Sequence, residues 1–144
     1  MKLSIVTTLY YSEPYIAEFY ERISTAAQRI TDDYELILVN DGSPDESLSA
    51  ALALYEKDKR VIVIDFAKNF GHHKAIMTGL SYAQGDYVFL IDSDLEEQPE
   101  NLDLFWNELH AAPNIDVVYG TQYKRKGGWF EKITGNIFYK LFNI

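Results

Sequence analysis

The sequence contains no cysteine, which excludes disulfides and thiolate metal sites and fits a reducing compartment. No apolar run approaches the roughly 20 residues that a membrane-spanning helix needs. The glycine patterns G-x-G-x-x-G and G-x-x-x-x-G-K are also missing, so the loops that bind dinucleotides and P-loop phosphates find no support. Any binding chemistry therefore comes from oxygen, nitrogen and aromatic side chains.

Basic residues are scarce over most of the chain. Residues 1–120 carry 8 Lys/Arg against 21 Asp/Glu, a net charge of −13, whereas residues 121–144 carry 5 against 1. This acidic body argues against nucleic acid as a partner, because binding to a phosphate backbone needs a basic face. If the body binds a phosphorylated ligand, a divalent metal ion is the expected mediator.

The residues that are present favour one globular domain. With 144 residues, of which 47% are hydrophobic and 15% aromatic, the chain can bury about two-thirds of its unfolded surface. Strand and helix patterns alternate, which is typical of a parallel βαβ sheet. Strands are expected over residues 2–9, 34–40, 60–65, a run that ends at 92, and 116–119, and helices over residues 15–30, 44–57, 74–83 and 100–110.

The segment after the second expected strand carries the signals of a helix start. Ser43 can cap the helix, Pro44 suits the first helical position, and Glu46 completes a capping box. We therefore expect this helix to open at Pro44.

Two carboxylates follow the apolar run Phe89-Leu90-Ile91. Asp92 and Asp94 are separated by Ser93, and open α/β sheets bind their ligands at the carboxyl ends of strands. Carboxylates are also the ligands that Mg²⁺ and Mn²⁺ prefer. Adjacent like charges do not stabilise a strand end. Taken alone, the pair fits either a metal site or a solvated turn.

Two other strand ends are polar. The first expected strand runs into Thr8-Leu9-Tyr10-Tyr11-Ser12-Glu13, which supplies aromatic rings and an acid, and the second runs into Asn40-Asp41-Gly42-Ser43. Because parallel strands place their carboxyl ends on one edge of the sheet, these segments and residues 92–94 are expected to form one crevice. Such a crevice could hold an aromatic base, a ribose and a diphosphate in sequence.

With these strand ends in hand, the chain resembles the family 2 glycosyltransferases of GT-A fold. The resemblance covers essentially all 144 residues, and five motifs in order are specific where one would be weak. The segments resemble the family's first strand with its P-x-Y-N-E turn (residues 4–13), V-D-D-G-S-x-D (39–45), R-N-x-G…A…G (68–71 with Ala75 and Gly79), D-x-D-L-Q-x-x-P-E (92–100) and V-x-G-S-R (118–122).

The resemblance implies an α/β fold with a mostly parallel central sheet and helices on both faces. Residues 1–120 would form the nucleotide-sugar-binding core, and residues 121–144 a basic, aromatic and amphipathic segment that begins an acceptor or membrane-proximal part. Members usually continue beyond this point with further acceptor-side residues and membrane helices. We therefore expect a C-terminally truncated part of a longer enzyme rather than a naturally short relative.

The resemblance also implies roles for individual residues. Tyr10 would pack on the base of the nucleotide, and Asp41 would accept a hydrogen bond from it. Asp92 and Ser93 would lie near the ribose and diphosphate. Asp94 would be the firmest ligand of a Mg²⁺ or Mn²⁺ ion, with Asp92 as a second ligand.

Several residues depart from the family pattern. Thr8 stands where the family has a proline, and it joins the expected donor-site residues at the end of the first strand. Glu13 lies one place later than the family's acid, so it takes that role only after a local shift. Glu96 replaces a glutamine and Gln122 an arginine. These changes leave the donor sugar open, along with the choice of UDP or GDP, and no residue is named as the catalytic base.

The look-alikes within the family transfer sugars to a polyprenyl phosphate. By that resemblance the chain would move a sugar, with inversion, from a nucleotide sugar to a lipid-phosphate or cell-surface glycan acceptor. It would work in the cytoplasm at the inner face of the membrane. Residues 124–142 have the composition of a helix on an anionic membrane surface, or of a helix that packs on the protein itself.

Two other functions remain open at this stage. One is a module that binds a nucleotide sugar without turnover, because the acceptor half is missing. The other is a nucleotidyltransferase, although residues 10–13 lack the glycine-rich basic loop of that class. His72 and His73 are neighbours in sequence and are not expected to converge on one metal ion, whereas contact with a phosphate is possible for them and for Lys74.

Overall fold

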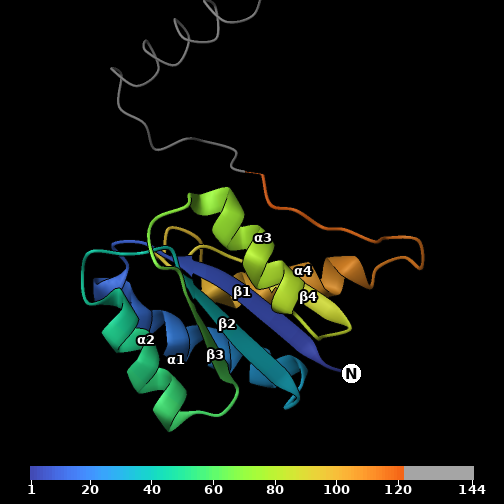
Figure 1. The fold of residues 1–144 in the computed structure, drawn as a ribbon. Helices are drawn as coiled ribbons and strands as arrows, with labels where there is room; N and C mark the ends of the chain where they lie inside the picture. Colours follow the sequence, from blue (N-terminus) through green and yellow to red (C-terminus); the bar gives the residue numbers. More distant parts are fainter. Residues whose placement is uncertain (122–144) are drawn as a thin grey trace, which may run out of the picture.

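The computed structural model describes residues 1–121, which form one parallel sheet covered by helices (Figure 1). The strand order is β3-β2-β1-β4, and all three pairings are parallel. The strands are β1 (Leu3–Leu9), β2 (Tyr34–Asn40), β3 (Val61–Asp65) and β4 (Tyr87–Leu90). The α/β class with a parallel central sheet, predicted from the sequence, is confirmed.

The two central strands are buried along almost their whole length. Every residue of β2 is buried, and so is every residue of β1 except Thr8. Strands that are covered on both faces read as continuous apolar runs rather than alternating ones, which explains why the sequences LSIVTTL and YELILVN form the centre of the sheet. The register pairs Leu9 with Asn40 and Asn40 with Asp65. The carboxyl ends of these three strands therefore lie level with one another.

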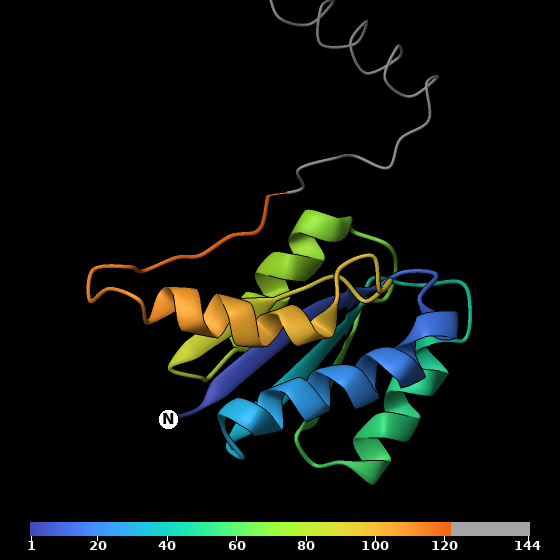
Figure 2. The same ribbon diagram turned by 180° about the vertical axis from the view of Figure 1, so that it is seen from behind.

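Helices cover both faces of the sheet, as predicted. Figure 2 shows α1 (Glu13–Ile30), α2 (Ser47–Lys57) and α4 (Leu102–Leu109) on one side, with α3 (His72–Tyr82) behind the sheet. The larger core lies under the first three helices and includes Ile16, Phe19 and Ile23 of α1. A short 3₁₀ turn, Pro99–Asn101, leads into α4.

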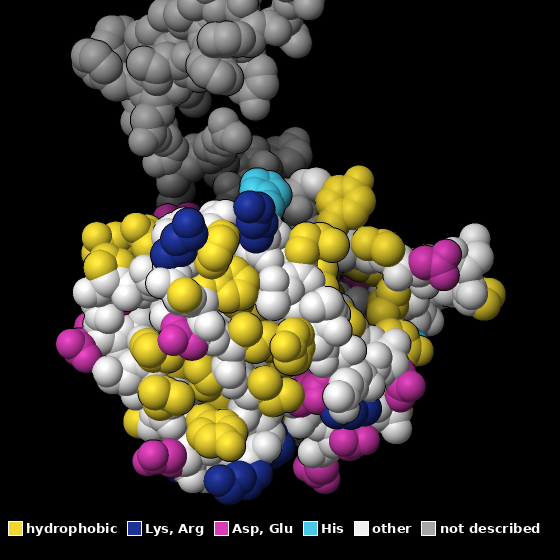
Figure 3. Space-filling model, in the orientation of Figure 1, with side chains coloured by type: hydrophobic (Ala, Val, Ile, Leu, Met, Phe, Trp, Pro, Cys, Tyr) yellow, Lys and Arg dark blue, Asp and Glu magenta, His cyan; other side chains and the backbone are white. Residues whose placement is uncertain are grey.

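Helix α3 packs closely on β1 and β2. A Cβ atom added to Gly79 would lie 2.4 Å from Val6 Cγ1 and 3.0 Å from Val39 Cγ2, so only glycine allows this approach. Ala75, one turn earlier, is also fully buried against the sheet. This single helix covers its face incompletely, and Figure 3 shows hydrophobic side chains over much of the surface beside it. The exposed ones include Met77 and Tyr82.

The predicted start of α2 at Pro44 is wrong. The helix begins at Ser47, and no side-chain hydrogen bond caps it. Instead of forming a capping box with Glu46, the Ser43 hydroxyl donates to the carboxylate of Asp45. That carboxylate also accepts the Ser47 N–H at 3.1 Å. The Ser43 N–H, which a capping box would direct to Glu46, donates to Asn40 Oδ1 at 3.3 Å instead.

Three other boundaries differ from prediction. Helix α3 starts at His72, two residues early, because Gly71 with φ +99° ends the preceding loop there. Strand β4 ends at Leu90, although the Ile91 N–H still donates to Val6 O at 3.2 Å. Residues 116–119 form no strand, and Val117 and Tyr119 are 75% and 79% exposed.

No helix within residues 1–121 is long and apolar enough to cross a membrane. Of residues 121–144, only Thr121 is among the described residues. The predictions for this segment, including membrane contact through residues 124–142, therefore fall outside them.

Candidate functional site

The loops after β1, β2 and β4 meet at the carboxyl edge of the sheet, as the sequence predicted. A chain of hydroxyl groups joins the first loop to the last. The Ser12 hydroxyl lies 3.0 Å from the Ser93 hydroxyl, which donates to the backbone oxygen of Thr8 at 3.0 Å. Ser12 Oγ in turn accepts the Tyr10 N–H. Ser93 is buried by these contacts, so it joins two loops and does not face an open crevice.

Serine hydroxyls also join the loop after β1 to the loop after β2. The Tyr11 N–H donates to Ser43 Oγ at 2.8 Å, and the Ser12 N–H donates to Ser47 Oγ at 3.0 Å. Sequence reasoning did not single out Ser12 or Ser47. These two residues contact each other although they lie 35 positions apart in the chain. A lone serine after a strand gives no signal of such a contact.

Asp45 anchors both helices that follow these loops. Its carboxylate accepts the N–H of Glu13 at the start of α1 and the hydroxyl of Ser47 at the start of α2. Burial raises the pKa of Asp45, but the hydrogen bonds from Ser43, Ser47 and Glu13 outweigh it and lower the pKa to about 2. Asp45 is therefore ionised at neutral pH, where its charge favours the two helix N-termini.

Asp41 shapes the loop before α3. Its carboxylate is 3% exposed and accepts the N–H groups of Phe70 and Gly71 at 2.7 and 3.0 Å. The neighbouring Gly42 has φ +60°, and a Cβ there would lie 2.4 Å from the carbonyl carbon of Lys68. The loop after β2 and the loop before α3 are thus in close contact. The motifs around Asp41 and around residues 68–71 form one unit.

Tyr10, Tyr11 and Glu13 lie at the open end of β1. The Tyr10 ring is 47% exposed and packs edge-on against Tyr11, with ring centroids 4.9 Å apart. Tyr11 has φ +54°, a backbone conformation that costs a bulky residue energy and is often found at functional loops. Glu13 begins α1, and its residue surface is exposed.

Asp92 and Asp94 both present exposed carboxylates at this edge. The buried Ser93 between them faces the protein, so the two acids face solvent on either side of it. Asp94 Oδ1 accepts the N–H of Glu96 at 2.9 Å. Leu95, with φ +61°, makes the tight turn that this contact needs.

Glu97 follows in the same loop and extends the acidic cluster. Burial raises the pKa of Glu97, and the nearby charges of Asp92, Asp94 and Glu96 raise it further. Four carboxyl groups therefore lie close enough to repel one another. A cation would relieve that repulsion.

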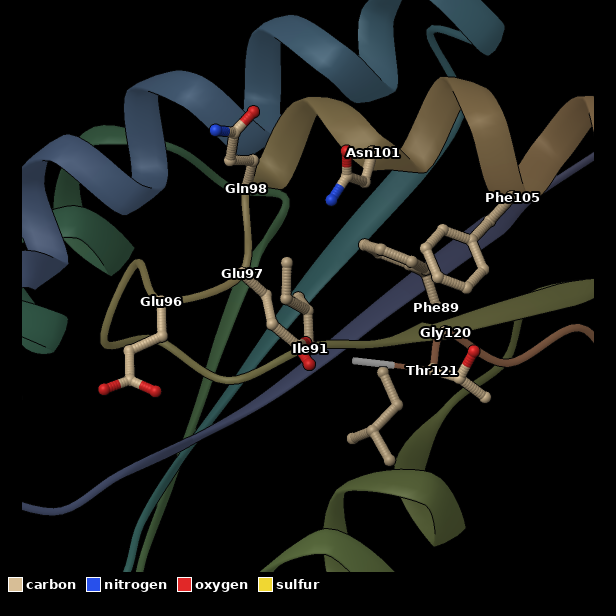
Figure 4. A pocket seen from close by; sticks show the side chains of 10 residues that line it. Phe89, Ile91, Glu96, Glu97, Gln98, Asn101, Phe105, Gly120 and Thr121 are labelled. Carbon is tan, nitrogen blue, oxygen red and sulfur yellow. The ribbon is translucent and has the colours of Figure 1, made fainter. Parts of the chain in front are cut away.

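A cavity of about 460 Å³ opens beside this loop. Figure 4 shows Glu97 and Asn101 in its lining, with the ring of Phe105, Gly120 and Thr121 together on the side away from Glu96. The end of β4 and residues 120–121 both line it. The cavity thus combines carboxylate, amide and aromatic groups next to Asp92 and Asp94.

The donor set at Asp92 and Asp94 fits a Mg²⁺ or Mn²⁺ ion that also binds a phosphorylated ligand. Within residues 1–121 no group of three or more His, Asp or Glu side chains forms a closed cage. Such ions are commonly held by one or two carboxylates, with the other positions taken by water and by phosphate oxygens. Two exposed carboxylates provide that arrangement.

His72 connects two of the residues singled out from the sequence. Its Nδ1 lies 3.1 Å from Thr8 Oγ1, and its Nε2 lies 3.8 Å from Asp92 Oδ1. His73 packs against the His72 ring, with centroids 5.9 Å apart. Lys68 and Lys74 lie over the ring of Phe70. Figure 3 shows histidine and lysine side chains gathered above this end of α3.

Comparison with known proteins places this site in context. The chain is 53% identical over 140 residues to a protein of Mycobacterium tuberculosis described as putative glycosyltransferases, and covers 41% of it with 97% of its own length. It is 32% identical over 141 residues to an undecaprenyl-phosphate 4-deoxy-4-formamido-L-arabinose transferase of Enterobacter, covering 42% of that protein with 97% of this chain. The chain thus spans less than half the length of these relatives.

Solved structures share the fold. The structure of TarS from S. aureus in complex with UDP matches with a TM-score of 0.59 and 30% identity, over 76% of this chain and 33% of that one. The mannosyltransferase PcManGT of Pyrobaculum calidifontis, solved with GDP-Man and Mn²⁺, matches with a TM-score of 0.57 and 23% identity, over 64% and 27%. These structural neighbours bind nucleotides or nucleotide sugars, and one of them binds Mn²⁺.

The family itself follows from the whole sequence. The model of the family described as glycosyl transferase family 2 matches residues 4–143. This match includes all five motifs and the three strand ends that form the candidate site. The chain therefore belongs to glycosyltransferase family 2.

Proposed function

We propose that the chain is the donor-binding part of an enzyme that transfers a sugar from a nucleoside-diphosphate sugar to a lipid-phosphate or glycan acceptor. The observation that carries the proposal is the meeting of an exposed aromatic ring and two exposed carboxylates at the carboxyl edge of the sheet. Tyr10 comes from the loop after β1, and Asp92 and Asp94 come from the loop after β4. Serine hydroxyls join these two loops. Each supplies a different part of nucleotide-sugar recognition.

The base and ribose would bind beside β1 and β2. The open face of Tyr10 offers a surface on which a planar base can stack. Asp41 already accepts two backbone N–H groups, and its oxygens keep further lone pairs for a donor on the base. Thr8 and Glu13 lie at the same edge and complete the proposed donor site. Ser93 would act by holding the loops of β1 and β4 in place.

Asp94 and Asp92 would hold the metal ion against the diphosphate. A bound Mg²⁺ or Mn²⁺ supplies Lewis-acid stabilisation of the negative charge that builds on the leaving diphosphate. The two carboxylates bind and orient, and Glu97 at the cavity rim keeps the negative charge of the cluster high. Lys68 and Lys74 offer positive charge near the same edge.

The reaction itself breaks the bond between the anomeric carbon and the diphosphate oxygen and forms a bond from the acceptor oxygen to that carbon. Attack from the opposite side inverts the configuration. A phosphate acceptor is ionised at neutral pH, so it can attack without a strong base. A lipid-phosphate acceptor also agrees with the similarity to the undecaprenyl-phosphate 4-deoxy-4-formamido-L-arabinose transferase of Enterobacter. We therefore propose an acceptor of the polyprenyl-phosphate class and a membrane-facing position in the whole enzyme.

Binding measurements with a charge-matched control test the donor site. We expect UDP, GDP or one of their sugars to bind the native chain in calorimetry only when Mn²⁺ or Mg²⁺ is present. Asp94→Ala should weaken that binding on the order of 100-fold, because it removes the firmest metal ligand. Asp32→Ala removes an exposed acid at the opposite edge of the sheet and should bind as the native chain does. Equal binding by the two variants would contradict the proposal.

A module that binds a nucleotide sugar without turnover is the second candidate. The two candidates differ in one observable. An enzyme releases the nucleoside diphosphate when a polyprenyl phosphate is added to the bound nucleotide sugar. A module binds the same sugar with the same metal dependence and releases nothing.

A further inference from the structure

His72 spans the gap between two loops of the candidate site. It is the first residue of α3, and its ring lies between the end of β1 and the loop after β4. Nδ1 lies 3.1 Å from Thr8 Oγ1, and Nε2 lies 3.8 Å from Asp92 Oδ1. Among the contacts of the described residues, this ring alone faces both residues at once.

We propose that His72 is a positioning residue for the Asp92 carboxylate, which it orients toward the metal ion of the donor site. The proposal rests on the proposed function, because the ion is part of that function. Oxygen ligands of metal ions usually need a hydrogen-bond partner on their free oxygen to fix their direction. The Asp92 side chain is 54% exposed, so its direction depends on such a partner.

The two contacts of the ring agree on where its proton lies. A hydrogen on Nε2 faces a carboxylate, whereas a hydrogen on Nδ1 would leave the Nε2 lone pair facing the negative charge of Asp92. The Thr8 hydroxyl can donate to an Nδ1 that carries no hydrogen. We therefore assign the ring as an acceptor from Thr8 and a donor toward Asp92.

The gap to Asp92 is longer than a hydrogen bond. The 3.8 Å separation exceeds the 2.7 to 3.2 Å range of N–H···O bonds. Both side chains are about half exposed, so rotation of either one closes the distance. Binding of a metal ion to the other oxygen of Asp92 would favour that closure, because it fixes the carboxylate.

Helix α3 gives His72 a fixed position. The N–H of Gly71, the residue before it, donates to Asp41 at 3.0 Å. Gly79 and Ala75 hold the rest of the helix against the sheet. His72 therefore projects from a rigid element that Asp41 anchors, and this links the nucleotide side of the site to its metal side.

His73 provides a matched control. It has the same side chain on the same turn of the helix and is also exposed. Its ring lies 5.9 Å from that of His72, at an angle of 81°. The contacts of the described residues do not join His73 to Thr8 or Asp92. Replacement of either histidine changes the helix start equally, but only one replacement removes the contact with Asp92.

The first experiment measures Mn²⁺ affinity by electron paramagnetic resonance on the native chain, His72→Ala, His72→Gln and His73→Ala. We expect His72→Ala to weaken Mn²⁺ binding about 10-fold, the lower end of the effect of losing a partner of a metal ligand. His73→Ala should match the native chain. His72→Gln keeps an N–H at a similar reach and should recover part of the loss. Native affinity in His72→Ala, or an equal loss in both alanine variants, would overturn the proposal.

The second experiment needs no metal ion, so it separates this proposal from the proposed function. Long-range proton–nitrogen spectra of the metal-free chain should show His72 with its hydrogen on Nε2. Thr8→Val and Asp92→Asn should each change the His72 ring nitrogen shifts more than those of His73. If the native chain binds no Mn²⁺, the proposed function fails. These spectra then still show whether the His72 ring contacts Thr8 and Asp92. Shifts of His72 that neither variant changes would overturn it.

Discussion

Glu35 and Asp58 at the amino edge of the sheet and Asp92 and Asp94 at its carboxyl edge are bonded in opposite ways. At the amino edge Glu35 is 5% exposed, and its carboxylate accepts the Ser4 hydroxyl and the Gln84 N–H at 2.6 and 2.7 Å. Lys2 pairs with its other oxygen. Asp58, at the same edge, is bound by the guanidinium of Arg60. The protein itself thus satisfies these charges.

At the carboxyl edge Asp41 and Asp45 are also held by hydrogen bonds, but Asp92 and Asp94 are left open. Asp94 accepts one N–H from Glu96, and Asp92 lies 3.8 Å from His72. An ionised group that is fully bonded within the protein stabilises the fold, and its removal leaves the partners unsatisfied. An acid that stays exposed beside other acids adds little to stability and remains free to bind a cation. The comparison therefore separates acids that maintain the structure from acids that bind a ligand.

The largest effect is expected for Glu35→Ala at the amino edge. The loss of the carboxylate leaves the Ser4 hydroxyl and the Gln84 N–H without their acceptor, so the free energy of unfolding should fall by about 4 kcal/mol. Urea unfolding followed by circular dichroism measures this, with Glu21→Ala as the exposed control. Nucleotide binding by the remaining folded fraction should not change. A loss in stability as small as that of the control would erase the distinction between the edges.

Gly42→Ala should damage the carboxyl edge through its backbone. The φ of +60° and the 2.4 Å approach to the Lys68 carbonyl carbon should together cost about 2–3 kcal/mol of unfolding free energy. Gly71→Ala is the matched control, because its φ is +99° while no atom lies within 4 Å of the added Cβ. It should cost less in the same urea experiment. Equal losses would show that backbone strain alone, without the contact between the two loops, sets the cost.

Asp58→Asn should weaken stability at neutral pH and flatten its acid dependence. The Arg60 guanidinium holds the pKa of Asp58 well below its usual range. A depressed folded-state pKa gives stability that is present above the unfolded pKa of about 3.9 and is lost as the pH falls below it. We expect a loss of about 2 kcal/mol at pH 7. The difference from the native chain should shrink toward pH 3. A difference that stays constant with pH would contradict this account.

The smallest effect is expected for Glu97→Gln. Its folded-state pKa is raised, first by burial and then by Asp92, Asp94 and Glu96, so the stability linked to its protonated form is present below the unfolded pKa and lost as the pH rises. The neutral amide of Glu97→Gln should raise the free energy of unfolding by less than about 0.5 kcal/mol at pH 7, because solvent screens the charge of an exposed group. Thermal unfolding should show this gain, and added Mn²⁺ should reduce it. A loss of stability would be the contrary result.

Most of the fold could be predicted from the sequence, because the strands and helices carry strong local patterns. The continuous apolar runs of β1 and β2 and the helical spacing of Ile16, Phe19 and Ile23 leave little choice. The predicted start of α2 is wrong, since Asn40 rather than Glu46 accepts the Ser43 N–H and Asp45 accepts the N–H of Ser47. Residues 116–119 have strand-like composition but form no strand, because strand propensity depends on context more than on the residues themselves.

The acids of the carboxyl edge could be predicted because they also follow a local sequence pattern. The contacts between the loops of this edge could not be predicted. Acids that follow apolar runs mark strand ends in any sequence, and Asp41, Asp92 and Asp94 were found that way. The contact of His72 with Thr8 joins residues 64 positions apart, and that between Ser12 and Ser93 joins residues 81 apart. No local pattern encodes such distances; they follow from the register of the sheet.

A nitrogen–proton shift map of the chain during titration with Mg²⁺ and UDP or GDP tests the central claim most directly. The account predicts that amide signals of Gly42, Gly71 and Ser93 move at the carboxyl edge, while those of Glu35 and Gly85 at the amino edge stay in place. The Asp94→Ala chain should show none of the movements at the carboxyl edge. Shifts that gather at the amino edge, or that persist unchanged in Asp94→Ala, would contradict it.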